Sequence, residues 1–240
     1  MSMIGLIPAR GDSKGIKNKN IVELNGKPLI AYTIKAALDA ERIDRVIVST
    51  DSKEVAKIAR DCGAEVPFLR PGELARDDTP DLPVMRYAID WLSDQEGYTC
   101  DYLVYLRPTT PFKTGALIDA AADKIVSEET CSGLRTVTPA EGVHHPYWMY
   151  RKSDEHLVSF IDGLDRDRYY QRQLLPLCFR VNGVVDIVRA ANIKRDILYG
   201  DRIAYYELTQ EQSLDIDTEY DLKVAEFLMR ESRKGGSKKG

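Results

Sequence analysis

Residues 4–10, IGLIPAR, lead directly into residues 11–20, GDSKGIKNKN, and this junction decides the fold class that the sequence predicts. A short apolar run bounded by glycine and proline is typical of a buried strand. In the loop that follows, Gly11 and Gly15 let backbone N–H groups approach an anion closely. The same loop carries four cations, Arg10, Lys14, Lys17 and Lys19. Because open α/β sheets bind ligands directly after their strands, we interpret this segment as a phosphate-binding loop rather than a solvated basic turn.

The loop matches neither of the two common glycine-rich nucleotide motifs. It lacks the spacing G-x-x-x-x-G-K-[ST] of P-loop proteins and the spacing G-x-G-x-x-G of dinucleotide-binding folds. The sequence therefore argues against a P-loop ATPase and against a nicotinamide-dependent enzyme.

The composition of the chain indicates which class of ligand the protein binds and in which cellular compartment it is found. The 240 residues suffice for one large domain, alone or with a small appendage, and a net charge of −4 argues against general nucleic-acid binding. The four scattered cysteines have no zinc-binding spacing, and no apolar stretch is long enough to span a bilayer. Because the N-terminus also lacks a signal-peptide pattern, we expect a cytoplasmic protein that binds small anions and no membrane.

Strand and helix patterns alternate through the first part of the chain. Apolar or β-branched runs predict strands at 45–51, 65–70, 102–107 and 133–138, and amphipathic runs predict helices at 29–40, 52–62, 82–95 and 114–128. This alternation predicts an α/β fold with a Rossmann-like, doubly wound, mostly parallel sheet. Two prolines stiffen the turn after the 102–107 strand, which should hold Arg107, Thr109 and Thr110 in a fixed geometry.

The alternation fails between residues 140 and 176, where aromatic and charged residues crowd together, as in HHPYWMY at 144–150. We expect residues 140–176 to form a small insertion that contacts a second copy in a homodimer. His144 and His145 are adjacent on an extended chain and cannot easily share a metal ion, so packing is the better interpretation. Strands at 179–188 and 202–208 and a helix over 218–232 complete the α/β domain, formed by 1–139 and 177–232. The tail 233–240 is expected to be disordered.

Asp215, Ile216 and Asp217 form the second informative motif. On an extended segment the two carboxylates point the same way while Ile216 enters the core, and paired carboxylates suit Mg²⁺. Helix capping by Asp217 or Thr218 is the simpler alternative, but it leaves Asp215 unexplained. A cationic loop for a triphosphate, combined with a carboxylate pair for its metal, is what nucleotidyl transfer requires.

The sequence resembles the CMP-sialic acid synthetases, the cytidylyltransferases that activate nonulosonic acids. The resemblance rests on IPARGDSKGI at 7–16 with Lys19 and Asn20, VSTD at 48–51, LRPGELA at 69–75, RPTTP at 107–111, HHP at 144–146, FRVNG at 179–183 and SLDIDT at 213–218. It covers nearly the whole chain in order, apart from the tail. It implies that CTP and a 2-keto sugar acid react to give a CMP-sugar and pyrophosphate, on an α/β domain with a dimerisation insertion.

The resemblance also implies roles for individual residues. Arg10, Gly11, Ser13, Lys14 and Lys19 would bind the triphosphate, and Asn20 and Arg70 would contact the cytidine. Asp215 and Asp217 would ligate Mg²⁺, and with Arg10 and Lys19 they would form the catalytic set. The sugar acid would meet Arg107, Thr109, Asn182 and Asp186, together with Arg172 across the dimer. The anomeric hydroxyl would attack the α-phosphorus, with Asp217 or a metal-bound water as candidate bases.

Two positions depart from the family pattern. The family usually has glutamine where this chain has Arg107, and an aromatic residue where it has Asp186. We expect these two residues to approach one another, because gaining opposite charges side by side costs less than gaining either alone. Alternatively, Arg107 binds an acidic or acylamino group of the sugar. The departures also leave open a cytidylyltransferase for a 3-deoxy-octulosonate, and a catalytically silent nucleotide-binding module is a further alternative.

Overall fold

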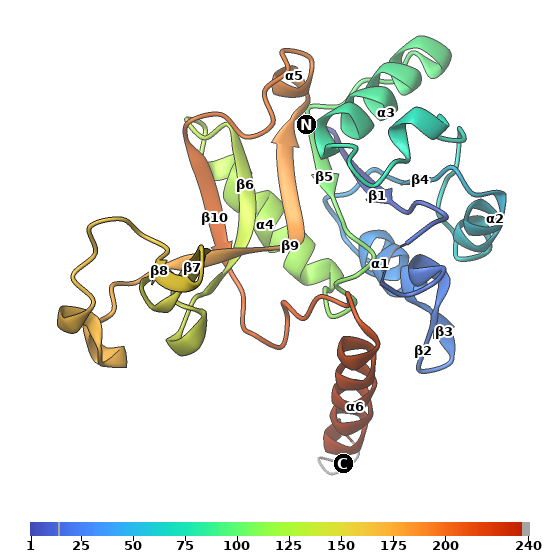
Figure 1. The fold of residues 1–240 in the computed structure, drawn as a ribbon. Coiled ribbons are helices and arrows are strands. Elements are labelled where there is room, and N and C mark those ends of the chain that lie inside the picture. The colour runs from blue at the N-terminus through green and yellow to red at the C-terminus, as the bar shows by residue number, and fades with distance from the viewer. Residues whose placement is uncertain (14, 237–240) are drawn as a thin grey trace.

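The computed structural model describes residues 1–13 and 15–236, and its centre is a six-stranded sheet (Figure 1). The strand order is β10-β6-β9-β5-β1-β4. The strands are β1 (Met3–Pro8), β4 (Arg45–Ser49), β5 (Tyr102–Tyr105), β6 (Gly133–Pro139), β9 (Phe179–Arg189) and β10 (Ile203–Glu207). β1 pairs in parallel with β4 and β5, β10 pairs in parallel with β6, and β9 runs antiparallel between β5 and β6. The predicted mostly parallel α/β sheet is therefore confirmed, with β9 as the reversed strand.

Helices cover both faces of the sheet because its strands are apolar on both sides. On β1, Met3 and Ile7 belong to one core cluster, and Ile4 and Leu6 belong to the cluster on the opposite face. The first cluster packs under α1 (Leu29–Leu38), α2 (Lys53–Asp61) and α4 (Gly115–Ser127), and the second under α3 (Asp81–Glu96) and α5 (Ala190–Ile193). This two-sided packing is what makes the sheet doubly wound.

Several smaller elements differ from the sequence prediction. Residues 65–70, predicted as a strand, join the sheet only through the isolated bridge between Ile47 and Glu65. A short hairpin, β2 (Glu23–Leu24) with β3 (Lys27–Pro28), precedes α1, and Asn25 and Gly26 turn it with positive φ. Single turns of 3-10 helix lie at Lys19–Ile21, Gly72–Leu74, Gly142–His144, Pro146–Trp148, Asp167–Tyr169 and Arg172–Leu174.

Residues 140–176 leave the sheet between β6 and β9 and extend away from it as an arm, seen at the left of Figure 1. The arm contains the hairpin of β7 (Tyr150–Ser153) and β8 (His156–Ser159). His145 is buried at its base, where Nδ1 accepts a hydrogen bond from the Tyr147 backbone and Nε2 lies 2.9 Å from the Pro176 carbonyl oxygen. This histidine packs within the arm and joins its two ends, as the sequence led us to expect of the His144-His145 doublet.

The last helix, α6 (Glu219–Gly236), extends outward from the domain and begins with a capping box. The Thr218 backbone N–H donates to Asp221 Oδ2 at 2.8 Å, and the Asp221 backbone N–H donates to Thr218 Oγ1 at 3.3 Å. The helix continues beyond its predicted end at residue 232, and residues 237–240 of the predicted tail lie outside the described residues. No helix in the described part of the chain is long and apolar enough to cross a membrane.

Candidate active site

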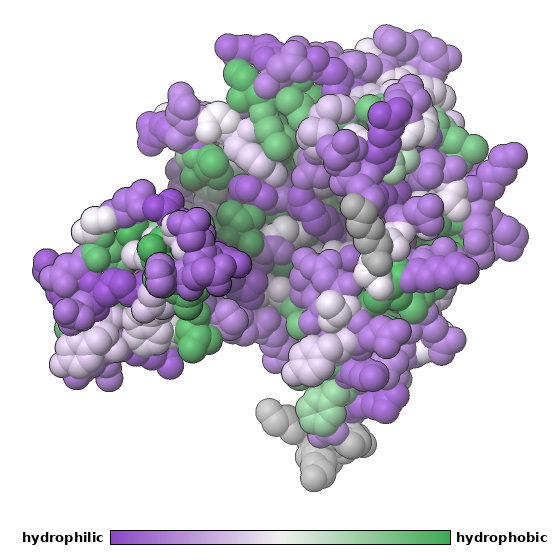
Figure 2. Space-filling model, viewed as in Figure 1, coloured by the Kyte–Doolittle hydropathy of each residue, from purple (hydrophilic) through white to green (hydrophobic). Residues whose placement is uncertain are grey.

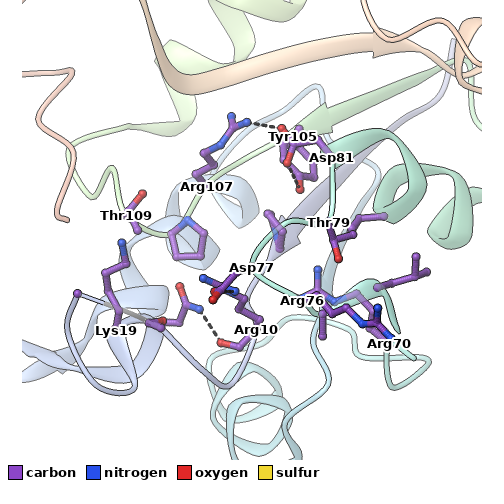
Figure 3. A pocket seen from close by; sticks show the side chains of 18 of the residues that line it. Arg10, Lys19, Arg70, Arg76, Asp77, Thr79, Asp81, Tyr105, Arg107 and Thr109 are labelled. Carbon is purple, nitrogen blue, oxygen red and sulfur yellow. Dashed lines mark hydrogen bonds and ion pairs between the residues drawn. The ribbon is translucent and has the colours of Figure 1, made fainter. Parts of the chain in front are cut away.

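A cavity of about 540 Å³ opens at the carboxyl ends of β1 and β5, where a parallel sheet places its ligands (Figure 3). Three groups of side chains line it. Lys19 and Thr109 lie at one side, Arg70 and Arg76 at another, and Arg107, Tyr105 and Asp81 at a third, with Arg10 and Asp77 between them. Ser13, Gly15, Asn20 and Asp217 also contribute to the wall. The cavity thus brings the loop after β1 together with the predicted acidic segment.

The loop after β1 is positioned by close contacts that favour glycine. The Gly11 backbone N–H donates to Asp51 Oδ1 at 2.9 Å, and a Cβ at Gly11 would lie 2.9 Å from the Ser52 Cβ. A Cβ at Gly15 would lie only 2.4 Å from the Asp217 carbonyl oxygen. The loop is therefore held between the end of β4 and the acidic segment, and Gly15 allows the two halves of the site to meet.

We expect Gly15→Ala to lower kcat/KM for CTP by at least about tenfold, because displacing either half of the site by a fraction of an ångström misaligns the reacting groups. The clash is with a backbone atom, which cannot swing aside as a flexible side chain would. Gly72→Ala is the matched control, since nothing lies within 4 Å of the added Cβ. Equal kcat/KM values for the two variants in a steady-state assay would contradict the close contact.

Two cations of the loop have carboxylate partners across the cavity. Arg10 forms an ion pair with Asp77, and Lys19 Nζ lies 2.8 Å from Asp217 Oδ1. The Asn20 side chain donates to the Arg10 carbonyl oxygen at 2.8 Å, which fixes the backbone at the start of the loop. Lys14, predicted to bind the triphosphate, lies outside the described residues. Ser13 lines the cavity as predicted for a phosphate contact.

Arg70 is a buried cation with no counter-ion among the ion pairs found in the described residues. Its side chain is 6% exposed and its Nε has no hydrogen-bond partner. Burial lowers the pKa of the Arg70 guanidinium, because removal from water disfavours the charged form. A buried polar group left unpaired at a cavity wall is suited to a polar or anionic ligand.

Of the predicted acidic segment, the structure confirms the burial of Ile216 and places Asp217, but not Asp215, among the residues that line the cavity. Ile216 is fully buried in a cluster with Ile16 and Leu29, while Asp215 and Asp217 on either side of it are exposed. The Ile216 backbone N–H donates to the Thr109 carbonyl oxygen at 2.8 Å, which ties the segment to the turn after β5. Thr218 and Asp221 supply the helix cap, so capping does not account for the two carboxylates.

The environment of Asp215 disfavours its negative charge. Desolvation and the neighbouring Asp217 charge raise the pKa of the Asp215 carboxyl, although a hydrogen bond from Thr109 opposes them. Two close carboxylates repel each other, and a divalent cation between them would relieve that repulsion. No group of three or more His, Cys, Asp and Glu side chains among the described residues is arranged to hold a metal.

Arg107 and Asp186 approach one another, as the sequence predicts. Arg107 Nη1 lies 2.7 Å from Asp186 Oδ2, and Arg107 Nη2 lies 2.5 Å from Asp81 Oδ2. Arg135 Nε adds a second cation at 3.1 Å from Asp186 Oδ1. Although burial lowers it, the charges of Asp81 and Asp186 raise the pKa of the Arg107 guanidinium above its usual range. Because two carboxylates already pair with Arg107, the structure argues against the alternative that Arg107 binds an acidic group of the sugar directly.

Three residues predicted to contact the sugar lie off the cavity wall. Asp186 is 0% exposed, so it acts on the cavity only through Arg107, which corrects its prediction as a direct sugar contact. Asn182 Oδ1 accepts from Thr136 Oγ1 at 2.6 Å, and its Nδ2 donates to Thr138 Oγ1 at 2.9 Å, within the bulged pairing of β6 and β9. Arg172 lies on the arm, 64% exposed, and pairs with Glu141. Thr109 does line the cavity.

Sequence reasoning missed Asp81, Tyr105 and Lys113. Asp81 begins α3 and accepts a hydrogen bond at 3.0 Å from the Tyr105 hydroxyl. An acidic residue in the first turn of a helix is common, so this residue gives no functional signal in the sequence. Lys113 is 4% exposed and donates to oxygens on Thr33, Arg107 and Thr110. Only the tertiary structure distinguishes it from an ordinary surface lysine.

Stability should depend on pH through Lys113. Burial lowers the pKa of its ammonium from 10.5 to about 7, with the nearby Asp215 charge raising it and the Arg107 charge lowering it. Between these values the unfolded chain binds the proton and the folded chain does not, so the free energy of unfolding rises with pH. We expect the wild type to gain up to about 1.4 kcal/mol per pH unit relative to Lys113→Met above about pH 7. Urea titrations of both proteins measure this difference, and a difference independent of pH would contradict it.

The fold and the cavity define a class of protein. An open α/β sheet, a cationic glycine-bearing loop after its first strand and Asp217 of an acidic segment beside that loop characterise a protein that binds a polyanionic nucleotide.

Comparison with known proteins gives the family. A model of the cytidylyltransferase family matches residues 4–233. The CMP-N,N'-diacetyllegionaminic acid synthase of Campylobacter jejuni shares 34% identity with this chain over 226 residues, which cover 93% of each chain. The N-acylneuraminate cytidylyltransferase of Escherichia coli shares 33% identity over 225 residues, covering 93% of this chain and 51% of that protein. The chain belongs to the cytidylyltransferase family.

A solved structure supports the fold. The structure of a CMP:2-keto-3-deoxy-manno-octonic acid synthetase in complex with CTP matches with a TM-score of 0.72, covering 97% of this chain and 100% of the other. The two sequences are 13% identical, so this likeness concerns the fold alone.

Proposed function

We propose that this protein transfers the CMP group of CTP to the anomeric hydroxyl of a nonulosonic acid of the sialic or legionaminic type. The hydroxyl oxygen forms a bond to the α-phosphorus, the bond to the pyrophosphate oxygen breaks, and the hydroxyl proton is released. The names of the relatives at 33–34% identity support this class of acceptor. For an octulosonate as acceptor, the support is limited to a likeness of fold to a structure that is 13% identical in sequence. A catalytically silent module would have no use for the acidic pair.

One observation carries the proposal: Lys19 from the phosphate loop meets Asp217, 198 residues away, at the cavity wall. This contact joins a cation suited to phosphate oxygens with a carboxylate suited to a hard metal ion. In this scheme Arg10, Ser13 and Lys19 hold the triphosphate, and Asn20 and Arg70 hold the cytidine, whereas the Gly11 backbone N–H, predicted to bind the triphosphate, is already bonded to Asp51. These groups orient the α-phosphorus and stabilise charge on its oxygens as pyrophosphate leaves.

Mg²⁺ is part of the proposal because the donor set fits it. Asp215 and Asp217 are two exposed acidic residues of a single segment, and Mg²⁺ binds through one or two carboxylates plus substrate phosphates. When bound, it would withdraw negative charge from the triphosphate.

We also propose a homodimer built on the arm, in a cytoplasmic enzyme. Large apolar side chains are exposed along the arm, at Val143, Leu157, Phe160, Tyr170 and Leu174, and Figure 2 shows hydrophobic residues exposed on it. Arg172 is exposed on the same arm and would reach the sugar acid in the other copy. Sedimentation of the wild type and of Leu157→Lys tests this, since a monomeric wild type would contradict the dimer. CTP as substrate and four free cysteines support the cytoplasmic location.

Pyrophosphate release tests the reaction directly. The assay contains CTP, Mg²⁺ and one acid from a panel of N-acetylneuraminic, legionaminic, pseudaminic and 3-deoxy-octulosonic acids. We expect release with a nonulosonic acid, and none when Mg²⁺ is chelated. Release with the octulosonate alone would replace the proposed acceptor, and no release with any acid despite CTP binding would refute the reaction.

A further inference from the structure

Lys113 lies behind the cavity wall, on the loop that joins β5 to α4. Its ammonium reaches four oxygen atoms: Arg107 O at 2.8 Å, Thr110 O at 2.5 Å, Thr110 Oγ1 at 2.8 Å and Thr33 Oγ1 at 3.0 Å. Three of these belong to the turn after β5, and the fourth belongs to α1. No carboxylate is among these hydrogen-bond partners, so the four oxygen atoms hold the buried nitrogen in place.

The turn that Lys113 holds supports both sides of the cavity. Its first residue, Arg107, extends toward Asp81 and Asp186. Two residues further on, Thr109 lines the cavity and its carbonyl oxygen accepts the Ile216 N–H at 2.8 Å. Ile216 is the buried residue between the two carboxylates, so a shift of the turn would move Arg107 and the acidic segment together.

We propose that Lys113 is a positioning residue, whose terminal nitrogen clamps the turn of residues 107–110 to α1 and so fixes Arg107 and the segment of Asp215 and Asp217 relative to the rest of the cavity. The expected effect of Lys113 on turnover rests on the proposed function, whereas its expected effect on the position of the turn does not. The triphosphate side of the cavity is held by other contacts, through Asn20, Asp51 and Asp77. Loss of the clamp should therefore affect turnover more than CTP binding.

The first test compares turnover in two lysine-to-methionine variants. Lys113→Met keeps most of the side-chain volume and removes the donor, and Lys124→Met is the control because that lysine pairs with Glu128 on the surface of α4. We expect kcat of Lys113→Met to fall by about 10²-fold, as for a misplaced reacting group, with KM for CTP within about threefold of wild type. Wild-type kcat in folded Lys113→Met would overturn the proposal.

The second test needs no catalysis. Hydrogen exchange of the Ile216 amide reports the hydrogen bond to Thr109, and we expect exchange at least about tenfold faster in Lys113→Met, with sheet amides such as Leu103 unchanged. Thr33→Val removes a single acceptor and should give a smaller change in the same direction. Unchanged Ile216 exchange in both variants would overturn the proposal, whereas failure of the proposed reaction would leave this measurement intact.

Chemical rescue separates positioning from simple packing. In Lys113→Ala the vacated space should admit a small alkylammonium ion, and we expect ethylammonium to restore part of kcat while neutral ethanol does not. A packing role would give equal effects of the two additives, which would contradict the clamp. Should Lys113→Ala fail to fold, Lys113→Met and Thr33→Val still decide the question.

Discussion

Asp215→Asn is expected to lose turnover by about 10³-fold or more, because a lost metal ligand removes several kcal/mol of transition-state stabilisation. Its midpoint of unfolding should stay the same or rise slightly. The carboxyl of Asp215 is an exposed side chain whose pKa is raised by desolvation and by Asp217, so its charge does not stabilise the fold. Pyrophosphate release and urea unfolding measure the two effects.

Glu211→Gln is the matched control for this variant, since Glu211 is an exposed acid on the same loop. It should leave both turnover and unfolding unchanged. A titration of rate against Mg²⁺ adds a third measurement, in which Asp215→Asn should need more metal than the wild type. Turnover like that of the wild type in Asp215→Asn would remove this residue from the metal site.

Asp186→Asn is expected to reduce the free energy of unfolding by about 2–3 kcal/mol. Removing one partner of a buried ion pair costs about 3–5 kcal/mol when the other charge is left fully buried. Here the two arginines retain some contact with water, with side chains 26% and 25% exposed, and Arg107 keeps Asp81 as a second partner, so the cost should be smaller. Urea unfolding monitored by circular dichroism measures it.

Asp162→Asn is the control for Asp186→Asn, because it also removes the carboxylate of one ion pair with an arginine. The pair of Arg151 and Asp162 is exposed, and such pairs contribute about 0–1 kcal/mol. A double-mutant cycle of Asp186→Asn with Arg107→Gln should give a coupling energy of about 1–3 kcal/mol. Equal losses of unfolding free energy in Asp186→Asn and Asp162→Asn would show that the burial of Asp186 does not add to the strength of its ion pairs.

The cationic loop and the acidic segment could be proposed from the sequence because each is encoded in a short stretch of residues. The glycines and cations of residues 10–20 indicate an anion-binding loop, and this indication does not depend on distant residues. The alternation of Asp215, Ile216 and Asp217 likewise follows from strand geometry, and the buried Ile216 confirms it. The pairing of Arg107 with Asp186 was predicted from two departures from the family pattern together with their opposite charges, and it is confirmed at 2.7 Å.

Other features could not be predicted, because they depend on which segments meet. β9 lies between β5 and β6 and runs antiparallel to both, and no pattern within residues 179–189 indicates this direction. Asn182 belongs to a motif that indicates sugar binding, yet its amide is bonded to threonines of β6. A side chain's hydrogen-bond partners are set by the neighbouring strand, and the neighbour is decided by topology.

The sequence by itself determined that a glycine-bearing cationic loop follows the first strand and that a carboxylate pair stands near the last helix. Only the tertiary structure decided that the loop and the acidic segment meet. Gly15 lies against the Asp217 carbonyl oxygen, and Lys19 contacts the Asp217 carboxylate. The tertiary structure also decided that Lys113 is a buried ammonium bonded to the turn of residues 107–110. The physical reason is that chemical character resides in side chains, whereas burial, pairing and proximity arise only when distant segments pack together.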